Sequence, residues 1–179
     1  MMRTGQIRVL SMAAVLVAVG IALGYLLVGV PNVEGISAVS FFAGYQLGAG
    51  PGAVVGGLSI GIFSLFNPLG PPLVQVLVAQ ILGMGIIGAS GDIWGRFAVK
   101  IRFAEFLAGA LGALLTFAYG ILADYGFAVS IGRWKDPLPV IAAGLPFSVI
   151  HIVSNGLIFA GLGAFLLRRP KASAYRDET

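Results

Sequence analysis

The single histidine of the chain lies inside a long apolar stretch, where a polar side chain is costly to bury. Ser148, Ser154 and Asn155 stand at offsets of −3, +3 and +4 from His151, so on a helix the four side chains share one face. A lone histidine is often a hydrogen-bonded core residue, but three polar neighbours also favour a binding role. Because the chain has no Cys and no second His, we expect no metal site and no other cofactor.

Other polar residues lie between apolar stretches. Asn32, Glu34 and Asn67 fall in two short segments rich in Pro and Gly. Residues 133–136, which include Trp134, are either a solvated loop with an interfacial tryptophan or a basic and aromatic cluster over a pocket. We expect three further polar residues of the spans to form hydrogen bonds between helices. These are Tyr45, Gln75 and Gln80.

Catalytic motifs are missing. The sequence has no Gly-x-x-x-x-Gly-Lys-Ser/Thr loop, so the chain does not bind ATP by a P-loop. His151 is the only strong candidate for an acid or base within the spans. We therefore expect that the chain is not itself an enzyme.

The composition requires a lipid environment for these residues. Of the 179 residues, 58% are hydrophobic and 10% are charged, and the mean hydropathy is +0.98. Soluble domains carry roughly 25% charged residues, and a domain of this size cannot bury so much apolar surface. The sequence predicts an all-α integral membrane protein with one transmembrane domain over residues 1–179.

Six apolar stretches predict a compact bundle of six helices. They cover residues 7–29, 36–47, 51–66, 72–93, 106–125 and 138–167, with a charged loop over 92–105. The first is longer than the apolar part of a signal peptide, about 7–15 residues, so we expect it to be retained. The second and third would be only about 18 and 24 Å long, against a hydrocarbon core of roughly 30 Å. They are short helices, helices extended into the loops, or a re-entrant hairpin, and we favour short helices.

Basic residues predict the orientation. With six crossings and the N-terminus inside, nine of the eleven Lys and Arg residues lie on the cytoplasmic side and only Arg133 and Lys135 lie outside. The positive-inside rule then places both termini, including a polar tail over 168–179, in the cytoplasm. Four crossings would satisfy the rule equally well. This clustering at the ends of spans explains the pI of about 9.8 without a nucleic-acid partner.

Small residues recur at a spacing of four in two places. Glycine makes up 27 of the residues, about twice its usual share of roughly 7%, and the run 44, 48, 52, 56 predicts close helix packing. Ala14, Ala18 and Ala22 form a shallow stripe on the first helix. That stripe packs against another helix of the chain or docks a helix of a partner protein.

Three stretches together resemble one family. They are the Ala14-xxx-Ala18 motif, the segment GGLSIGIFSLFNPLGP at 56–71 and the segment HIVSNGLIF at 151–159. With the size and the six spans, the chain resembles the S components of energy-coupling factor (ECF) vitamin transporters, over nearly its whole length. These are the substrate-binding subunits of an ABC-family uptake system in bacterial and archaeal cell membranes.

The resemblance implies a function and a set of residues. It implies high-affinity binding of a water-soluble vitamin or related small molecule, and partners consisting of a transmembrane coupling subunit and two ATPases. The alanines at 14, 18 and 22 would dock the coupling subunit. The residues implied for substrate binding are Asn32, Glu34, Asn67, Trp134, His151 and Asn155. The alternatives are a membrane-embedded enzyme or a structural or assembly subunit that binds no solute.

The expected topology places the substrate site near the outer end of the bundle, where the first, third and fifth loops emerge. His151 is 14 residues past Pro137, about 21 Å along an ideal helix, so it belongs near the floor of a pocket. Asn155 lies one turn deeper and would support the floor. Trp134 would cover a bound ring by stacking.

Overall fold

The computed structural model describes residues 4–97 and 102–167, and within these ranges all regular structure is helical. The six helices are α1 (Thr4–Leu27), α2 (Ile36–Leu47), α3 (Ala49–Leu65), α4 (Val74–Phe97), α5 (Ala104–Ser130) and α6 (Leu138–Leu167). By length and composition, α1, α4, α5 and α6 are able to cross a membrane. The chain is therefore an all-helical, multi-pass membrane protein in its described part.

The two short helices predicted from sequence are confirmed at 12 residues for α2 and 17 for α3. They are separated at Gly48, whose φ of 99° is in the left-handed region that glycine adopts without steric cost. Both helices are shorter than the four membrane-length helices.

The charged loop predicted over residues 92–105 is wrong at both ends. α4 continues to Phe97, so Asp92 and Arg96 lie on its last turns, and α5 begins at Ala104 and includes Glu105 in its first turn. The guanidinium of Arg96 bonds to the carboxylate of Asp92 at 2.6 Å. Charges one turn apart on a helix satisfy each other, so they did not end it.

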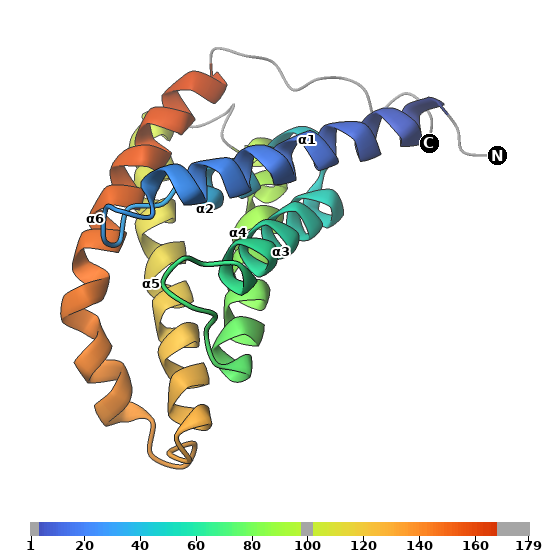
Figure 1. Cartoon of the computed structure of the whole chain (residues 1–179). Coiled ribbons are helices and arrows are strands. Elements are labelled where there is room, and N and C mark those ends of the chain that lie inside the picture. The colour runs from blue at the N-terminus through green and yellow to red at the C-terminus, as the bar shows by residue number, and fades with distance from the viewer. Residues whose placement is uncertain (1–3, 98–101, 168–179) are drawn as a thin grey trace.

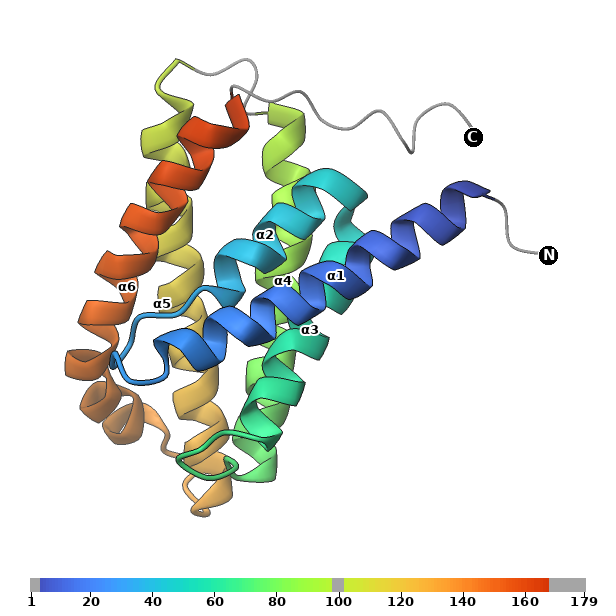
Figure 2. The ribbon, with the colours of Figure 1, turned by 45° about the horizontal axis from the view of Figure 1, so that its top comes forward.

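α1 lies across the other long helices. α4, α5 and α6 run side by side, whereas α1 crosses them and packs on α2 and α3 (Figures 1 and 2). Only three of the 24 residues of α1 are buried, against nine of the 12 residues of α2. α2 is thus enclosed within the bundle, and the α1–α2 loop is brought against α6.

Glycines bring α2, α3 and α4 into backbone contact. A Cβ atom on Gly44 would overlap the carbonyl oxygen of Gly88, and one on Gly88 would overlap that of Gly52. Gly56 meets the backbone of Met84 in the same way. The predicted role of these small residues in tight packing within the chain is confirmed.

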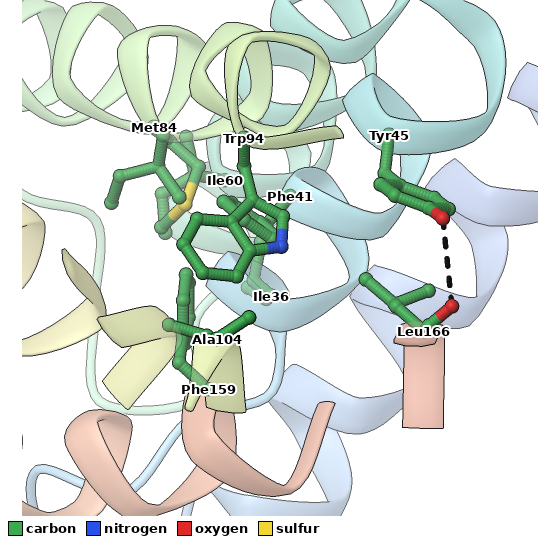
Figure 3. Packing of buried hydrophobic residues seen from close by; sticks show 11 residues of the cluster. Ile36, Phe41, Tyr45, Ile60, Met84, Trp94, Ala104, Phe159 and Leu166 are labelled. Atoms are coloured by element: carbon green, nitrogen blue, oxygen red, sulfur yellow. Dashed lines mark hydrogen bonds between the residues drawn. The ribbon is translucent and has the colours of Figure 1, made fainter. Parts of the chain in front are cut away.

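The core between α2, α4 and α6 is aromatic (Figure 3). The rings of Phe41 and Phe159 lie 4.9 Å apart between centroids, and the ring of Trp94 lies 6.5 Å from that of Phe41. The hydroxyl of Tyr45 donates to the carbonyl of Leu166 at 3.5 Å, a long hydrogen bond between α2 and α6.

The hydrogen bonds between helices predicted for Gln75 and Gln80 are also confirmed. Ser64 donates to Gln80 at 2.9 Å and so links α3 to α4. Ser130 donates to Gln75 at 3.0 Å and links α5 to α4. These bonds keep polar side chains satisfied between apolar helices.

Several residues used for the orientation fall outside the described ranges. They are Arg3, Lys100, Arg168, Arg169, Lys171 and Arg176, together with the whole tail 168–179. The cytoplasmic placement of both termini stays a prediction.

Candidate functional site

A cavity of about 500 Å³ lies between the α1–α2 loop, the α3–α4 loop and residues of all six helices. Most of its wall is apolar. Its polar lining residues are Asn32, Glu34, Ser64, Asn67, Gln80, Tyr119 and His151. A concave, mostly apolar space with a few convergent polar groups is the usual form of a small-molecule site.

Glu34 is positioned by the start of α2. The backbone N–H of Ser37 donates to both carboxylate oxygens, at 3.0 and 3.3 Å. The first N–H groups of a helix have no acceptor within the helix, and a negative charge is favourable there. The sequence thus fixes the carboxylate at the helix start while one side of it faces the cavity.

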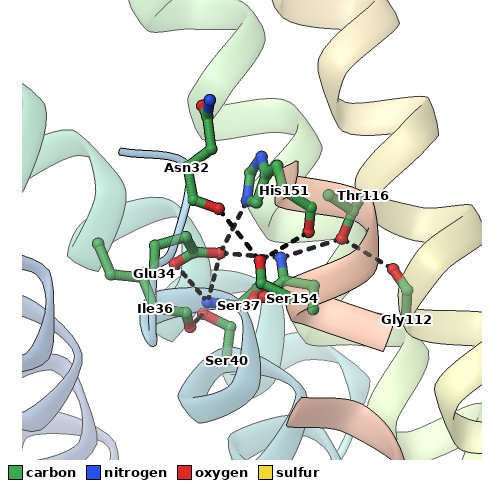
Figure 4. Close-up of polar contacts among 10 residues, drawn as sticks. Asn32, Glu34, Ile36, Ser37, Ser40, Gly112, Thr116, His151 and Ser154 are labelled. Atoms are coloured by element: carbon green, nitrogen blue, oxygen red, sulfur yellow. Dashed lines mark hydrogen bonds and ion pairs between the residues drawn. The ribbon is translucent and has the colours of Figure 1, made fainter. Parts of the chain in front are cut away.

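A polar network joins the α1–α2 loop, which carries Asn32 and Glu34, to α5 and α6 (Figure 4). The amide of Asn155 donates to Thr116 Oγ1 at 3.0 Å and, more weakly, to Glu34 Oε1 at 3.4 Å. The Thr116 hydroxyl in turn donates a hydrogen bond to the carbonyl of Gly112 at 2.8 Å. Ser154 donates to the carbonyl of Asn32 at 3.1 Å.

His151 completes the site from α6. Its Nε2 atom lies 3.6 Å from Glu34 Oε1, an ion-pair distance when the ring is protonated but too long for a hydrogen bond. Within the described residues, Nε2 is buried and has no hydrogen-bond partner. The ring meets Tyr119 edge to face, with 6.0 Å between centroids. The arrangement leaves a carboxylate and an imidazole nitrogen side by side at the cavity.

Two opposing influences act on the pKa of Glu34, which lies outside the spanning helices. Burial raises the pKa of this carboxyl, whereas the contacts with His151 and with Ser37 lower it, and the net direction is downward. Glu34 is therefore ionised at neutral pH, and the cavity contains a negative charge.

The structure brings most of the proposed binding residues together. Asn32, Glu34, Asn67 and His151 line the cavity. Asn155 is fully buried beside Glu34 and does not line it.

Trp134 is not part of this group. It lies in the α5–α6 loop with its side chain 56% exposed, and Lys135 Nζ sits 5.0 Å from the centre of its ring. His151 is midway along the 30 residues of α6, so the loop before that helix is about 20 Å away along the axis. The expectation that Trp134 covers the pocket does not fit this placement.

Sequence reasoning missed the contribution of α5. Tyr119 lines the cavity and Thr116 supports Asn155. These two residues are three apart and so share one helical face. Polar side chains gathered on one face of an apolar helix were the signal that identified His151, and the same criterion would have pointed to Thr116 and Tyr119.

A second cavity of about 460 Å³ lies between α5 and α6, near the α5–α6 loop. It is lined by Asp124 and Arg133 among mainly apolar residues, and Arg133 already pairs with Asp136 at 2.9 Å. Fewer polar groups converge there than around Glu34. The cavity at Glu34 is the stronger candidate for a binding site.

The three alanines of α1 are exposed. Ala14, Ala18 and Ala22 lie on the face of α1 that points away from α2 and α3. The alternative in which this stripe packs against a helix of the same chain does not fit the described structure.

Comparison with protein-family models, with curated proteins and with solved structures found no match to this chain.

Proposed function

We propose that the chain is the solute-binding subunit of an ECF-type uptake transporter, and that its solute is a water-soluble vitamin or a related small molecule. The cavity that Glu34 and His151 line together is the observation that carries the proposal. Its size and its few convergent polar groups suit one small organic molecule. The resemblance of the segments at 56–71 and 151–159 to S components supports the same function.

In this proposal the exposed alanines of α1 are the docking surface. Small side chains let a helix of the transmembrane coupling subunit approach closely in lipid, and Ala14, Ala18 and Ala22 are exposed on α1. Two ATPases attached to the coupling subunit would supply the energy. The chain itself would bind the solute in a bacterial or archaeal cell membrane, with both termini in the cytoplasm.

A thermal-shift screen of the purified protein against water-soluble vitamins tests solute binding directly. For a vitamin that raises the melting temperature, we expect His151→Ala and Asn67→Ala to weaken binding by about 1–3 kcal/mol, as for the loss of a buried hydrogen bond. Trp134→Ala is the matched control and should leave the affinity unchanged, because its side chain lies outside the cavity. Unchanged affinity in both cavity variants, with the protein still folded, would show that the solute binds elsewhere. A screen without any hit would favour an assembly subunit.

A further inference from the structure

The charges around the cavity restrict the solute. Among the described residues that line it, none is Lys or Arg, and Glu34 is the only carboxylate. With Glu34 ionised, Glu34 and His151 together carry a net charge of minus one or zero, never a positive one. Moving an anion into an apolar site without a counter-charge is costly. The cavity therefore disfavours solutes that would bring a second negative charge.

The unused hydrogen-bonding positions of Glu34 and His151 define the chemistry of one end of the solute. The carboxylate accepts the Ser37 N–H and the Asn155 amide, but an ionised carboxylate has about four acceptor sites. His151 Nε2 is without a partner among the described residues. A group with N–H donors would satisfy the carboxylate, and it would be most favourable if positively charged.

The side-chain amides of Asn67 and Gln80 call for hydrogen-bond acceptors on the solute, whereas Glu34 calls for donors. The side-chain oxygen of Asn67 accepts the Leu69 N–H at 2.9 Å, and that of Gln80 accepts the Ser64 hydroxyl at 2.9 Å. With their oxygens engaged, both amides retain N–H donors. They offer hydrogen bonds to oxygen or nitrogen acceptors of the solute.

Aromatic rings line the space between these groups. Phe63, held edge to face against Tyr25, and Tyr119, held against His151, both line the cavity. Rings of this kind pack well against a flat solute, and they also attract a cation over their faces.

We infer that the solute is a flat, nitrogen-bearing ring compound, cationic or neutral, whose N–H groups bind Glu34 and whose acceptors bind Asn67 and Gln80. Glu34 is then the residue that selects against anionic solutes. The inference rests on the proposed function only in treating the cavity as a solute site, and it adds the chemical class of the solute.

Three ring compounds of equal size test the inference. Benzamidine is a cation, benzamide is neutral and benzoate is an anion. Their binding to the purified protein in detergent is measured at millimolar concentration by ligand-observed NMR. We expect benzamidine to bind most tightly, benzamide more weakly and benzoate not at all. This ranking needs no variant, so it does not depend on any substitution being tolerated.

The substitution Glu34→Gln should weaken the binding of benzamidine by about tenfold or more, the loss expected for a charge-assisted hydrogen bond. It should change the affinity for benzamide little. Glutamine retains an oxygen for the Ser37 N–H, so the start of α2 is preserved. Glu105→Gln, in the first turn of α5 and outside the cavity lining, is the matched control. It should leave the binding of all three ring compounds unchanged.

Three results would overturn the inference: no binding of benzamidine, benzoate binding as tightly as benzamidine, or benzamidine unaffected by Glu34→Gln. If the vitamin screen gives a ligand whose binding depends on His151 while benzamidine does not bind, the proposed function stands and the solute class is wrong. If benzamidine depends on Glu34 but no vitamin binds, the solute class stands and vitamin uptake is wrong.

Discussion

Small residues spaced four apart occur in two regions of the molecule with opposite outcomes. In the glycine contact, defined by Gly44 and Gly52 of the run at 44–56 together with Gly88 of α4, the backbones of α2, α3 and α4 touch and the residues are buried. In the alanine stripe, defined by Ala14, Ala18 and Ala22, the side chains lie on the open face of α1. The spacing predicts a surface suited to close approach, and the structure decides whether the chain itself fills that surface.

The residue type explains part of the difference. Glycine has no Cβ, so two helix backbones are able to touch directly. Their axes then lie closer together than any side chain would allow. An alanine methyl sets a larger minimum separation and leaves a smooth groove. In lipid such a groove is stable when it faces acyl chains, and equally able to receive another helix.

The largest effect should come from filling the glycine contact. In Gly88→Ala, the new methyl would collide with the backbone of Gly52 and Ala53, which cannot turn aside as a side chain can. We expect a loss of about 3 kcal/mol, the upper end for overpacked cores, seen as a lower melting temperature in mild detergent. Gly161→Ala in α6 is the matched control, because a Cβ there meets nothing within 4 Å. Equal melting temperatures for the two variants would contradict the close packing of α3 and α4.

A smaller effect is expected at Gly20, where α1 itself packs on α3. A Cβ on Gly20 would lie 2.9 Å from Ser59 Oγ and 3.2 Å from Ser59 Cβ. The hydroxyl is able to rotate away, although it would give up its long bond to the carbonyl of Val17 at 3.5 Å. We expect Gly20→Ala to cost about 1 kcal/mol in the same melting experiment. A loss as large as that of Gly88→Ala would mean that α1 is held as rigidly as the glycine contact.

The sequence predicted local features well and relative placement poorly. The bounds of α2 and α6 agree with the prediction because turn residues mark them, Gly48 for one and Pro137 for the other. His151 was identified by type, since a polar group is costly within an apolar span, whereas Glu34 entered the predicted site through the resemblance to S components. Trp134 was misplaced because nothing in the sequence gives the angle at which α1 crosses α4 to α6. That angle brings the α1–α2 loop to the middle of α6, away from the loop that carries Trp134.

The smallest effect on folding should come from the alanine stripe. In Ala18→Leu, the larger side chain projects from the open face of α1, where no described helix is displaced, so the melting temperature and ligand binding should stay unchanged. If the stripe docks the coupling subunit, the added bulk holds the two helices apart, and co-purification of the chain with the coupling subunit and ATPases from native membranes should fall strongly. Val19→Leu is the matched control, because Val19 is 41% exposed on α1 but lies about 100° around the helix from Ala18. A drop in melting temperature as large as that of Gly20→Ala would assign the stripe to packing within the chain. Unchanged co-purification with an unchanged melting temperature would leave it facing lipid and remove α1 as the docking surface.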